Sequence, residues 1–435
     1  MISLRDHQER FQLAAPTVEG QVTRVRGLLL EGAVAGAAVG DLYRILARGG
    51  GILAEVVAVD GTSAILMPFG STQGLSVGDR LVRAGDAQRV QVSESMQGRV
   101  LDSLGRPLDN GSALFGGRDV PLHREPLAPM RRAPVNQRMP LNIRSLDAFA
   151  PAGRGQRLGI FAGAGVGKST LLGMIAKNAS ADVVVLALVG ERGREVGHFV
   201  RDVLGPALER SVVVVATSDR PPTERIRAAF FATAVAESFR DEGANVLLFV
   251  DSLTRVCMAQ REIGLAVGEP PTTKGYPPST FAMLPRLLER AAPEVGGGSI
   301  TGIYTVLVEG DDLSDPVSDS ARSLLDGHIV LSRELAERGR YPAVDVLRSL
   351  SRVESQVSEA WERQAAGQVR EWLGLVEESK DLIAVGAYKP GADPKLDGAL
   401  ARQSVIEAFL KQSADEPVEL PETLAQLAAL AEVSP

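Results

Sequence analysis

A glycine-rich segment that ends in Lys-Ser-Thr is the part of this sequence whose residue types point most directly to chemistry. Residues 159–170 read GIFAGAGVGKST, and a helix-like segment, residues 170–176, follows at once. Phosphate oxygens need several donors at short range and no side chains in the way, which glycines and exposed backbone N–H groups provide. The segment therefore predicts a phosphate-binding loop between a strand and a helix. The alternative, a glycine-rich turn that holds no nucleotide, is disfavoured by the complete Lys-Ser-Thr ending.

Each position of this loop has an expected role. Lys168 would reach the β- and γ-phosphates of a nucleotide, and the Ser169 hydroxyl would ligate Mg²⁺. The usual pattern opens with Gly where this chain has Ala162, a mild change because the glycines nearest the phosphates are intact. The positions predicted to contact the nucleotide are Ala162, Gly163, Ala164, Gly165, Val166, Gly167, Lys168, Ser169 and Thr170.

Two carboxylates follow other apolar runs and would complete such a site. The run at residues 246–251, VLLFVD, ends on Asp251, which would lie near the loop at the edge of a parallel sheet and hold the metal through water. In LVGERGRE, residues 188–195, Glu191 is the first carboxylate after the run and the candidate general base. Arg192 could neutralise charge that develops on the γ-phosphate. Spacing alone leaves open a solvated charged loop of internal salt bridges.

The elements that must position these residues follow from the apolar pattern. From residue 143, continuous apolar runs alternate with helical segments. Such runs are typical of strands that are buried on both faces of a sheet. The runs predicted to be strands of a parallel sheet are residues 157–162, 182–190, 211–217, 246–251 and 302–308. We therefore predict an α/β core whose helices cover both faces of the sheet.

The chain on either side of this core has a different character. Short β-rich runs with a turn signal about every ten residues fill residues 18–90, which is typical of a small barrel or sandwich. Residues 98–110 and the proline-rich residues 121–140 are interpreted as a connector. From residue 351 the pattern is polar and helical, through residues 353–380 and 396–411, and ends in a Glu/Pro-rich tail. The predicted parts are a tail (1–17), a β-barrel (18–95), a nucleotide-binding domain (96–350) and a helical domain (351–435).

Composition limits the class of protein. The 435 residues are 23% charged with a net charge of −7, so the chain has no general attraction for nucleic acid. One cysteine, Cys257, excludes an internal disulfide framework and fits a reducing compartment. Residues 1–10 are polar and do not resemble a signal peptide. The longest apolar runs, such as residues 183–189, are far shorter than the ~20 residues of a membrane span. The sequence predicts a cytoplasmic protein whose membrane contact is at most peripheral.

Several longer motifs resemble one family, the rotary-type hexameric ATPases, and within it the ATPases of type III protein export. These motifs are GERGRE (190–195), DSLTR (251–255), AQREIG (259–264), GEPP (268–271) and KGYPPS (274–279). The likeness extends from about residue 18 to residue 388. Two sequence motifs resemble the flagellar export ATPase more than the injectisome version. They are TKGY (273–276) and GAY (386–388), the second followed by the Asp393-Pro394 and Leu396-Asp397 pairs.

The resemblance implies a fold and further site residues. The fold would be a P-loop, RecA-like core with an N-terminal β-barrel and a C-terminal helical domain. Arg255 would lie on the γ-phosphate side, and Tyr341 matches the aromatic residue that stacks on adenine. Arg352 matches the arginine finger that reaches the neighbouring subunit's site. Non-catalytic subunits of related rings lack the Glu found here at position 191, so Glu191 favours an active enzyme.

The function that the resemblance implies is Mg²⁺-dependent ATP hydrolysis by a homohexamer that energises type III protein export. Of the two export systems, the resemblance favours the flagellar one. Its partners would be regulatory stator and stalk proteins, complexes of export chaperones with their substrates, and a membrane-embedded export gate. The protein would act in the cytoplasm, peripheral to the inner membrane. The alternatives are an injectisome ATPase and a nucleotide-dependent assembly module whose transport is driven elsewhere. An RNA-translocating ring is disfavoured by the acidic charge balance.

Overall fold

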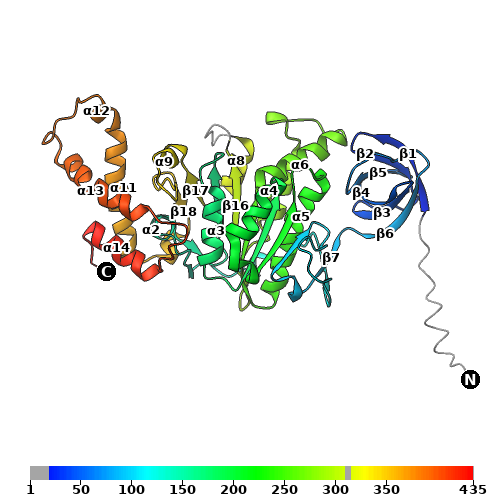
Figure 1. Ribbon diagram of the computed structural model, residues 1–435, viewed down its shortest axis with the longest axis horizontal. Coiled ribbons are helices and arrows are strands. Elements are labelled where there is room, and N and C mark those ends of the chain that lie inside the picture. Colours follow the sequence, from blue (N-terminus) through cyan, green and yellow to red (C-terminus); the bar gives the residue numbers. More distant parts are fainter. Residues whose placement is uncertain (1–18, 309–314, 435) are drawn as a thin grey trace, which may run out of the picture.

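A computed structural model describes residues 19–308 and 315–434. A β-barrel stands at one end of the elongated chain, a sheet covered by helices occupies the middle, and a group of helices forms the other end (Figure 1). The predicted N-terminal tail, residues 1–17, lies outside the described residues. No helix in the described ranges is both long and apolar enough to cross a membrane.

The N-terminal part is a closed barrel, which excludes the sandwich alternative. Its six strands pair in the order β1-β2-β5-β4-β3-β6. They are β1 (Glu19–Arg26), β2 (Leu29–Ala33), β3 (Asp41–Ala47), β4 (Gly50–Asp60), β5 (Ser63–Pro68) and β6 (Arg80–Asp86). Alternate side chains of β3, such as Tyr43 and Ile45, fill the interior with Leu30 and Leu66. Closure pairs every strand on both sides and so removes open sheet edges.

The middle part is an eight-stranded sheet in the order β18-β17-β12-β16-β15-β13-β14-β8. Its strands are β8 (Arg99–Asp102), β12 (Arg157–Ala162), β13 (Val183–Val189), β14 (Ser211–Ala216), β15 (Asn245–Asp251), β16 (Ser299–Leu307), β17 (Gly327–Leu331) and β18 (Leu350–Ser351). The pairings are parallel except that β18 runs antiparallel to β17. The five predicted strands are confirmed as β12 to β16.

Helices cover both faces of this sheet, as predicted. Side chains alternate between the faces along a strand. In β13, Val184 and Leu186 join a core with helix α3 (Lys168–Asn178), whereas Val185 and Ala187 join a core with helix α5 (Pro222–Asp241). The helical elements are α2 (Arg144–Phe149), α3 (Lys168–Asn178), α4 (Gly193–His198), π-helix η3 (Phe199–Leu204), η4 (Gly205–Arg210), α5 (Pro222–Asp241), α6 (Leu253–Ala266), η5 (Thr273–Gly275), α7 (Pro278–Leu288), α8 (Pro316–Leu324) and α9 (Arg333–Glu337).

The connector predicted for residues 98–110 is wrong in part, because its first residues form the edge strand β8. The Arg99 guanidinium donates two hydrogen bonds of 2.8 Å to the Asp109 carboxylate, which also accepts from the Val100 N–H. These bonds hold the pKa of Asp109 well below its usual range. The remaining short elements between barrel and sheet are β7 (Arg89–Val92), η1 (Glu94–Met96), β9 (Arg118–Pro121), η2 (Pro129–Arg131), β10 (Arg138–Met139) and β11 (Ala152–Gly153). The predicted domain bounds stay a prediction, and β7 pairs with β9 rather than with a barrel strand.

The C-terminal part is helical, but its predicted Glu/Pro-rich tail is wrong. The helices are α10 (Glu354–Val357), α11 (Ala360–Glu378), α12 (Lys380–Ala384), α13 (Pro394–Leu410) and α14 (Leu420–Ala431). Helix α14 forms where the tail was expected, because Thr423, Leu427 and Ala431 recur at helical spacing and are buried. It packs against α2 and α11. The final segment is therefore packed into the core that the C-terminal helices share with α2.

Removing the Leu427 side chain tests this packing. Leu427 is fully buried, so Leu427→Ala is expected to lower the free energy of unfolding by about 2–5 kcal/mol. Leu382→Ala removes the same atoms from a side chain that is 55% exposed and should change it little. Calorimetric unfolding of both variants checks this. Equal unfolding midpoints for the two variants would contradict the packed position of α14.

Candidate functional site

The sheet order places the candidate site on one edge. The phosphate loop, residues 163–167, follows β12, Asp251 ends β15, and Glu191 comes two residues after the end of β13. Strands β12, β16, β15 and β13 are neighbours and run parallel, so their carboxyl ends meet at the same edge. The predicted proximity of loop, base and metal-side carboxylate follows from this order.

Lys168 joins the three segments. It is the first residue of α3, and its Nζ forms ion pairs with Asp251 Oδ1 and, at 3.5 Å, with Glu191 Oε1. The side chains of Lys168, Glu191 and Asp251 are only 12%, 16% and 4% exposed. The two carboxylates compensate the charge of this buried cation. The predicted phosphate-binding role of Lys168 would require it to exchange these partners for phosphate oxygens.

The loop backbone is shaped as a phosphate cradle. Gly165 and Gly167 have φ of +79° and +89°, in the left-handed region that favours glycine. Gly167 is the N-cap of α3, whose first N–H groups are free to bind an anion. A Cβ atom at Gly167 would approach Cε1 of Tyr341 to 3.3 Å. The Tyr341 ring thus lies against the loop and is 48% exposed, as a surface for a planar base would be.

The other loop positions divide between sheet and surface. Ala162 is the last residue of β12, and its carbonyl accepts a hydrogen bond from the Val308 N–H. Gly163 and Val166 are buried. The positions exposed to an incoming ligand are Ala164, Gly165, Ser169 and Thr170.

The backbone of Glu191 fixes its position, and the surrounding groups shift the pKa of its carboxyl. Its carbonyl accepts from the Ser218 N–H at 3.0 Å, which ties it to the end of β14. Burial raises the pKa of its carboxyl, the nearby cation of Lys168 lowers it, and the Asp251 charge raises it; the net direction is upward. A carboxylate with a raised pKa is a stronger base once it is deprotonated.

Arg255 lies beside this base. Its Nε is 3.7 Å from Glu191 Oε1, and its side chain packs against Gly190, where a Cβ atom would approach Arg255 Cδ to 2.5 Å. Helix α6, which carries Arg255, is capped by Ser252, whose hydroxyl accepts from the Arg255 N–H. The glycine before the base therefore leaves room for a cation beside it.

The structure also brings in Thr305, which the sequence analysis missed. Thr305 lies near the carboxyl end of β16, its side chain is fully buried, and its hydroxyl donates to Asp251 Oδ1 at 2.6 Å. The available signal was a hydroxyl residue inside the apolar run of residues 302–308.

Two predicted arginines lie outside this cluster. Arg192 is 72% exposed and pairs with Glu195 at 3.5 Å. Arg352 is exposed, its guanidinium donates to the Arg322 carbonyl, and its N–H donates to the Asp326 carbonyl. Asp326 is bonded to Arg157, the first residue of β12, so Arg352 lies at the amino edge of the sheet.

The loop begins six residues further along β12, and at ~3.3 Å per residue this is about 20 Å away. Arg352 therefore cannot reach the loop of its own chain.

The residues fit a magnesium ion that is bound mainly through nucleotide phosphates. In the described part of the chain, no group of three or more His, Cys, Asp and Glu side chains could hold a metal ion. Mg²⁺ keeps several waters and takes one or two protein oxygens beside phosphates. The Ser169 hydroxyl in the first turn of α3 and the Asp251 carboxylate match that donor set.

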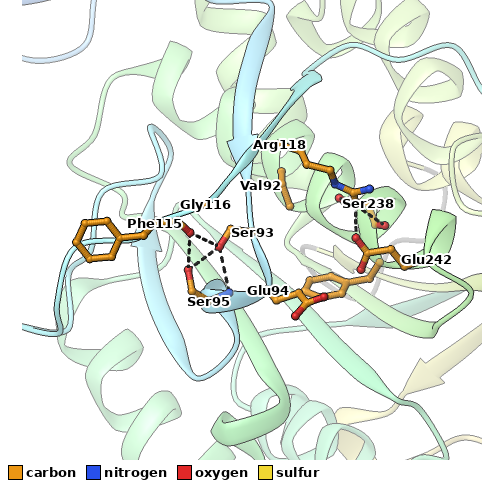
Figure 2. A pocket seen from close by; sticks show the side chains of 10 residues that line it. Val92, Ser93, Glu94, Ser95, Phe115, Gly116, Arg118, Ser238 and Glu242 are labelled. Carbon is orange, nitrogen blue, oxygen red and sulfur yellow. Dashed lines mark hydrogen bonds and ion pairs between the residues drawn. The ribbon is translucent and has the colours of Figure 1, made fainter.

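A hollow of about 380 Å³ lies elsewhere, among β7, η1, β9 and the end of α5 (Figure 2). The hydroxyls of Ser93 and Ser95 both donate to the Phe115 carbonyl, and Arg118 bonds Ser238 and Glu242. Glu242 precedes β15, which places the hollow at the amino edge, away from the phosphate loop. Because its polar groups bond one another, this hollow is explained by local structure.

Family comparisons cover most of the chain. Residues 22–85 match the β-barrel domain of the ATP synthase alpha/beta family, and residues 142–351 match the nucleotide-binding domain of the same family. Residues 358–429 match the T3SS EscN ATPase C-terminal domain.

Individual relatives agree with this match. The flagellum-specific ATP synthase of Pseudomonas aeruginosa is 49% identical, over 98% of this chain and 96% of its own. The type 3 secretion system ATPase of Xanthomonas euvesicatoria is 48% identical, over 94% and 93%. The assembled ATPase EscN from enteropathogenic E. coli superposes with a TM-score of 0.90 at 43% identity, over 95% of this chain and all of that chain. The same ATPase in complex with its central stalk EscO gives 0.87 at 42% identity, with the same coverage.

The raised pKa of Glu191 predicts how ATP turnover depends on pH. A general base acts when it is deprotonated. As the pH is lowered, turnover should therefore begin to fall at a pH above the ordinary glutamate pKa of about 4.3. Turnover per chain measured across pH, with circular dichroism to verify folding, checks this. Glu209→Gln, which removes an exposed carboxylate away from the cluster, should keep the profile. An acidic limb at or below the ordinary value would contradict the assignment.

Proposed function

The chain belongs to the ATP synthase alpha/beta family, in the branch of the type III export ATPases, and we propose that it hydrolyses ATP with Glu191 as the general base. The observation that carries the proposal is the position of Lys168 Nζ at the start of α3, between Asp251 and Glu191. This arrangement puts a phosphate-binding cation, a metal-side carboxylate and a base within one buried cluster.

The chemistry follows from these positions. The phosphates of ATP enter at the N-terminus of α3, and Lys168 exchanges its carboxylate partners for β- and γ-phosphate oxygens. Ser169 and Asp251 would hold Mg²⁺, which would supply positive charge to neutralise the phosphates. Glu191 accepts a proton from water as the new O–P bond forms to the γ-phosphorus, and the bond from that phosphorus to the bridging oxygen breaks to release ADP. Arg255, beside Glu191, offsets the negative charge that spreads over the phosphoryl oxygens, and Arg192 would join it after leaving Glu195 for the phosphate.

Each site would be completed by the next subunit of a homohexameric ring. Arg352 lies about 20 Å along the sheet from its own loop, which supports a role at another chain's site. An arginine supplied in trans contributes several orders of magnitude in rate in other nucleotidases. The assembled state of the similar ATPase EscN supports this arrangement.

The cellular role of this ATPase is to energise type III protein export. We assign it to the flagellar apparatus because of the sequence motifs at residues 273–276 and 386–388. The injectisome is the alternative, because relatives of both kinds are about equally identical to this chain. The complex of EscN with its stalk supports a stalk partner here as well. We also propose stator proteins, chaperone–substrate complexes and the export gate as partners, which places the protein in the cytoplasm at the inner membrane.

Completion of the site by a neighbour predicts concentration dependence. ATP turnover per chain, measured with Mg²⁺, should rise as the protein is concentrated and the ring assembles. Mass measurement at each concentration identifies the species present. A nucleotide-dependent assembly module would instead bind ATP, form rings and show no turnover at any concentration.

Mixing two inactive variants tests Arg352 directly. Lys168→Ala and Arg352→Ala should each abolish turnover, and mixed rings should recover part of it, because some sites then combine an intact Lys168 with an intact Arg352. The control replaces Lys168→Ala by the double variant, which supplies no intact Arg352. Failure to recover turnover in rings shown to be mixed would refute a role in trans.

A further inference from the structure

The strand between the phosphate loop and the metal-side carboxylate carries a buried hydroxyl in contact with that carboxylate. Strand β16 lies between β12 and β15, and Thr305 pairs in register with Ile160 of β12. The Thr305 hydroxyl is 2.6 Å from Asp251 Oδ1 and 3.5 Å from the Val250 carbonyl, so the carboxylate is its main acceptor. The side chains of Thr305 and Asp251 are both buried.

Asp251 Oδ1 is shared with Lys168. In the described part of the chain, the protein groups that donate to this carboxylate are Lys168 and Thr305. When Lys168 moves to phosphate, Thr305 is the donor that remains. A ligating carboxylate keeps its orientation through such outer hydrogen bonds, whose loss typically costs 10- to 100-fold in metal affinity.

The hydroxyl is not required by the packing of the strand. The neighbouring positions Ile303 and Val306 are buried and apolar, and a valine has nearly the shape of threonine. Burying a hydroxyl is unfavourable unless it is hydrogen-bonded, and here the bond is made to a charged group of the site.

We propose that Thr305 is a positioning residue, whose hydroxyl fixes the Asp251 carboxylate for the magnesium ion of bound MgATP. This role rests on the proposed nucleotide site, and it acts on metal-dependent binding before any chemical step.

The test measures binding rather than turnover. A fluorescent, non-hydrolysable ATP analogue is titrated into the full chain with Mg²⁺ and with EDTA, and the ratio of the two dissociation constants gives the gain in affinity from the metal. Thr305→Val should reduce this gain about tenfold, equivalent to about 1.4 kcal/mol, while affinity in EDTA stays unchanged. Thr305→Ser keeps the hydroxyl and should restore the gain.

Thr301→Val is the matched control on the same strand. The Thr301 hydroxyl is also buried and accepts from the Gly155 N–H at 2.9 Å, but at the amino end of β16. Thr301→Val should lower the unfolding midpoint about as much as Thr305→Val does, and should leave the gain in affinity from Mg²⁺ unchanged.

The outcomes separate the two proposals. A wild-type gain from Mg²⁺ that Thr305→Val retains overturns the role of Thr305 and leaves the nucleotide site standing. Equal loss in Thr305→Val and Thr301→Val assigns the effect to stability and also overturns it. Absence of nucleotide binding by the wild-type chain would overturn the site and this proposal together.

Discussion

The ion pairs of Lys168 with Asp251 and Glu191 set the geometry of the candidate site, and the surrounding elements hold these three side chains together. A buried ammonium group is unfavourable unless carboxylates compensate it, and these two carboxylates are themselves buried. The three residues come from segments more than twenty residues apart in sequence, and parallel pairing brings them to one edge. The sheet, its two helical layers and the tight turns after the strands serve to hold these charges at short range.

The same sheet separates two functions at its two edges. Its carboxyl edge carries the phosphate loop and the carboxylates, while its amino edge carries Arg352 beside Asp326. One rigid sheet can therefore present a nucleotide site to one neighbour and an arginine to another. Because strands do not bend to bring opposite edges together, the role proposed for Arg352 would require assembly to complete a site.

Much of this arrangement could be predicted from residues. The loop with Lys168, the buried runs that end before Glu191 and at Asp251, and the change of pattern at residue 351 are local signals, because phosphate binding and burial on both faces restrict residue types over short stretches. The edge strand β8, helix α14 and the partner of Asp251 on β16 were missed. An edge strand of four residues and a helix rich in alanine carry weak patterns, and their stability comes from packing against distant segments.

Residue types and their near spacing were sufficient to predict a nucleotide-phosphate site, a candidate base and a fold around a parallel sheet. Tertiary structure decided strand order, and with it the approach of Lys168 to both carboxylates, the contact of Tyr341 with Gly167 and the bond from Thr305 to Asp251. It also decided that Arg352 lies beyond reach of its own site. Distances between segments depend on how strands pair across the whole sheet, and no local pattern encodes that order.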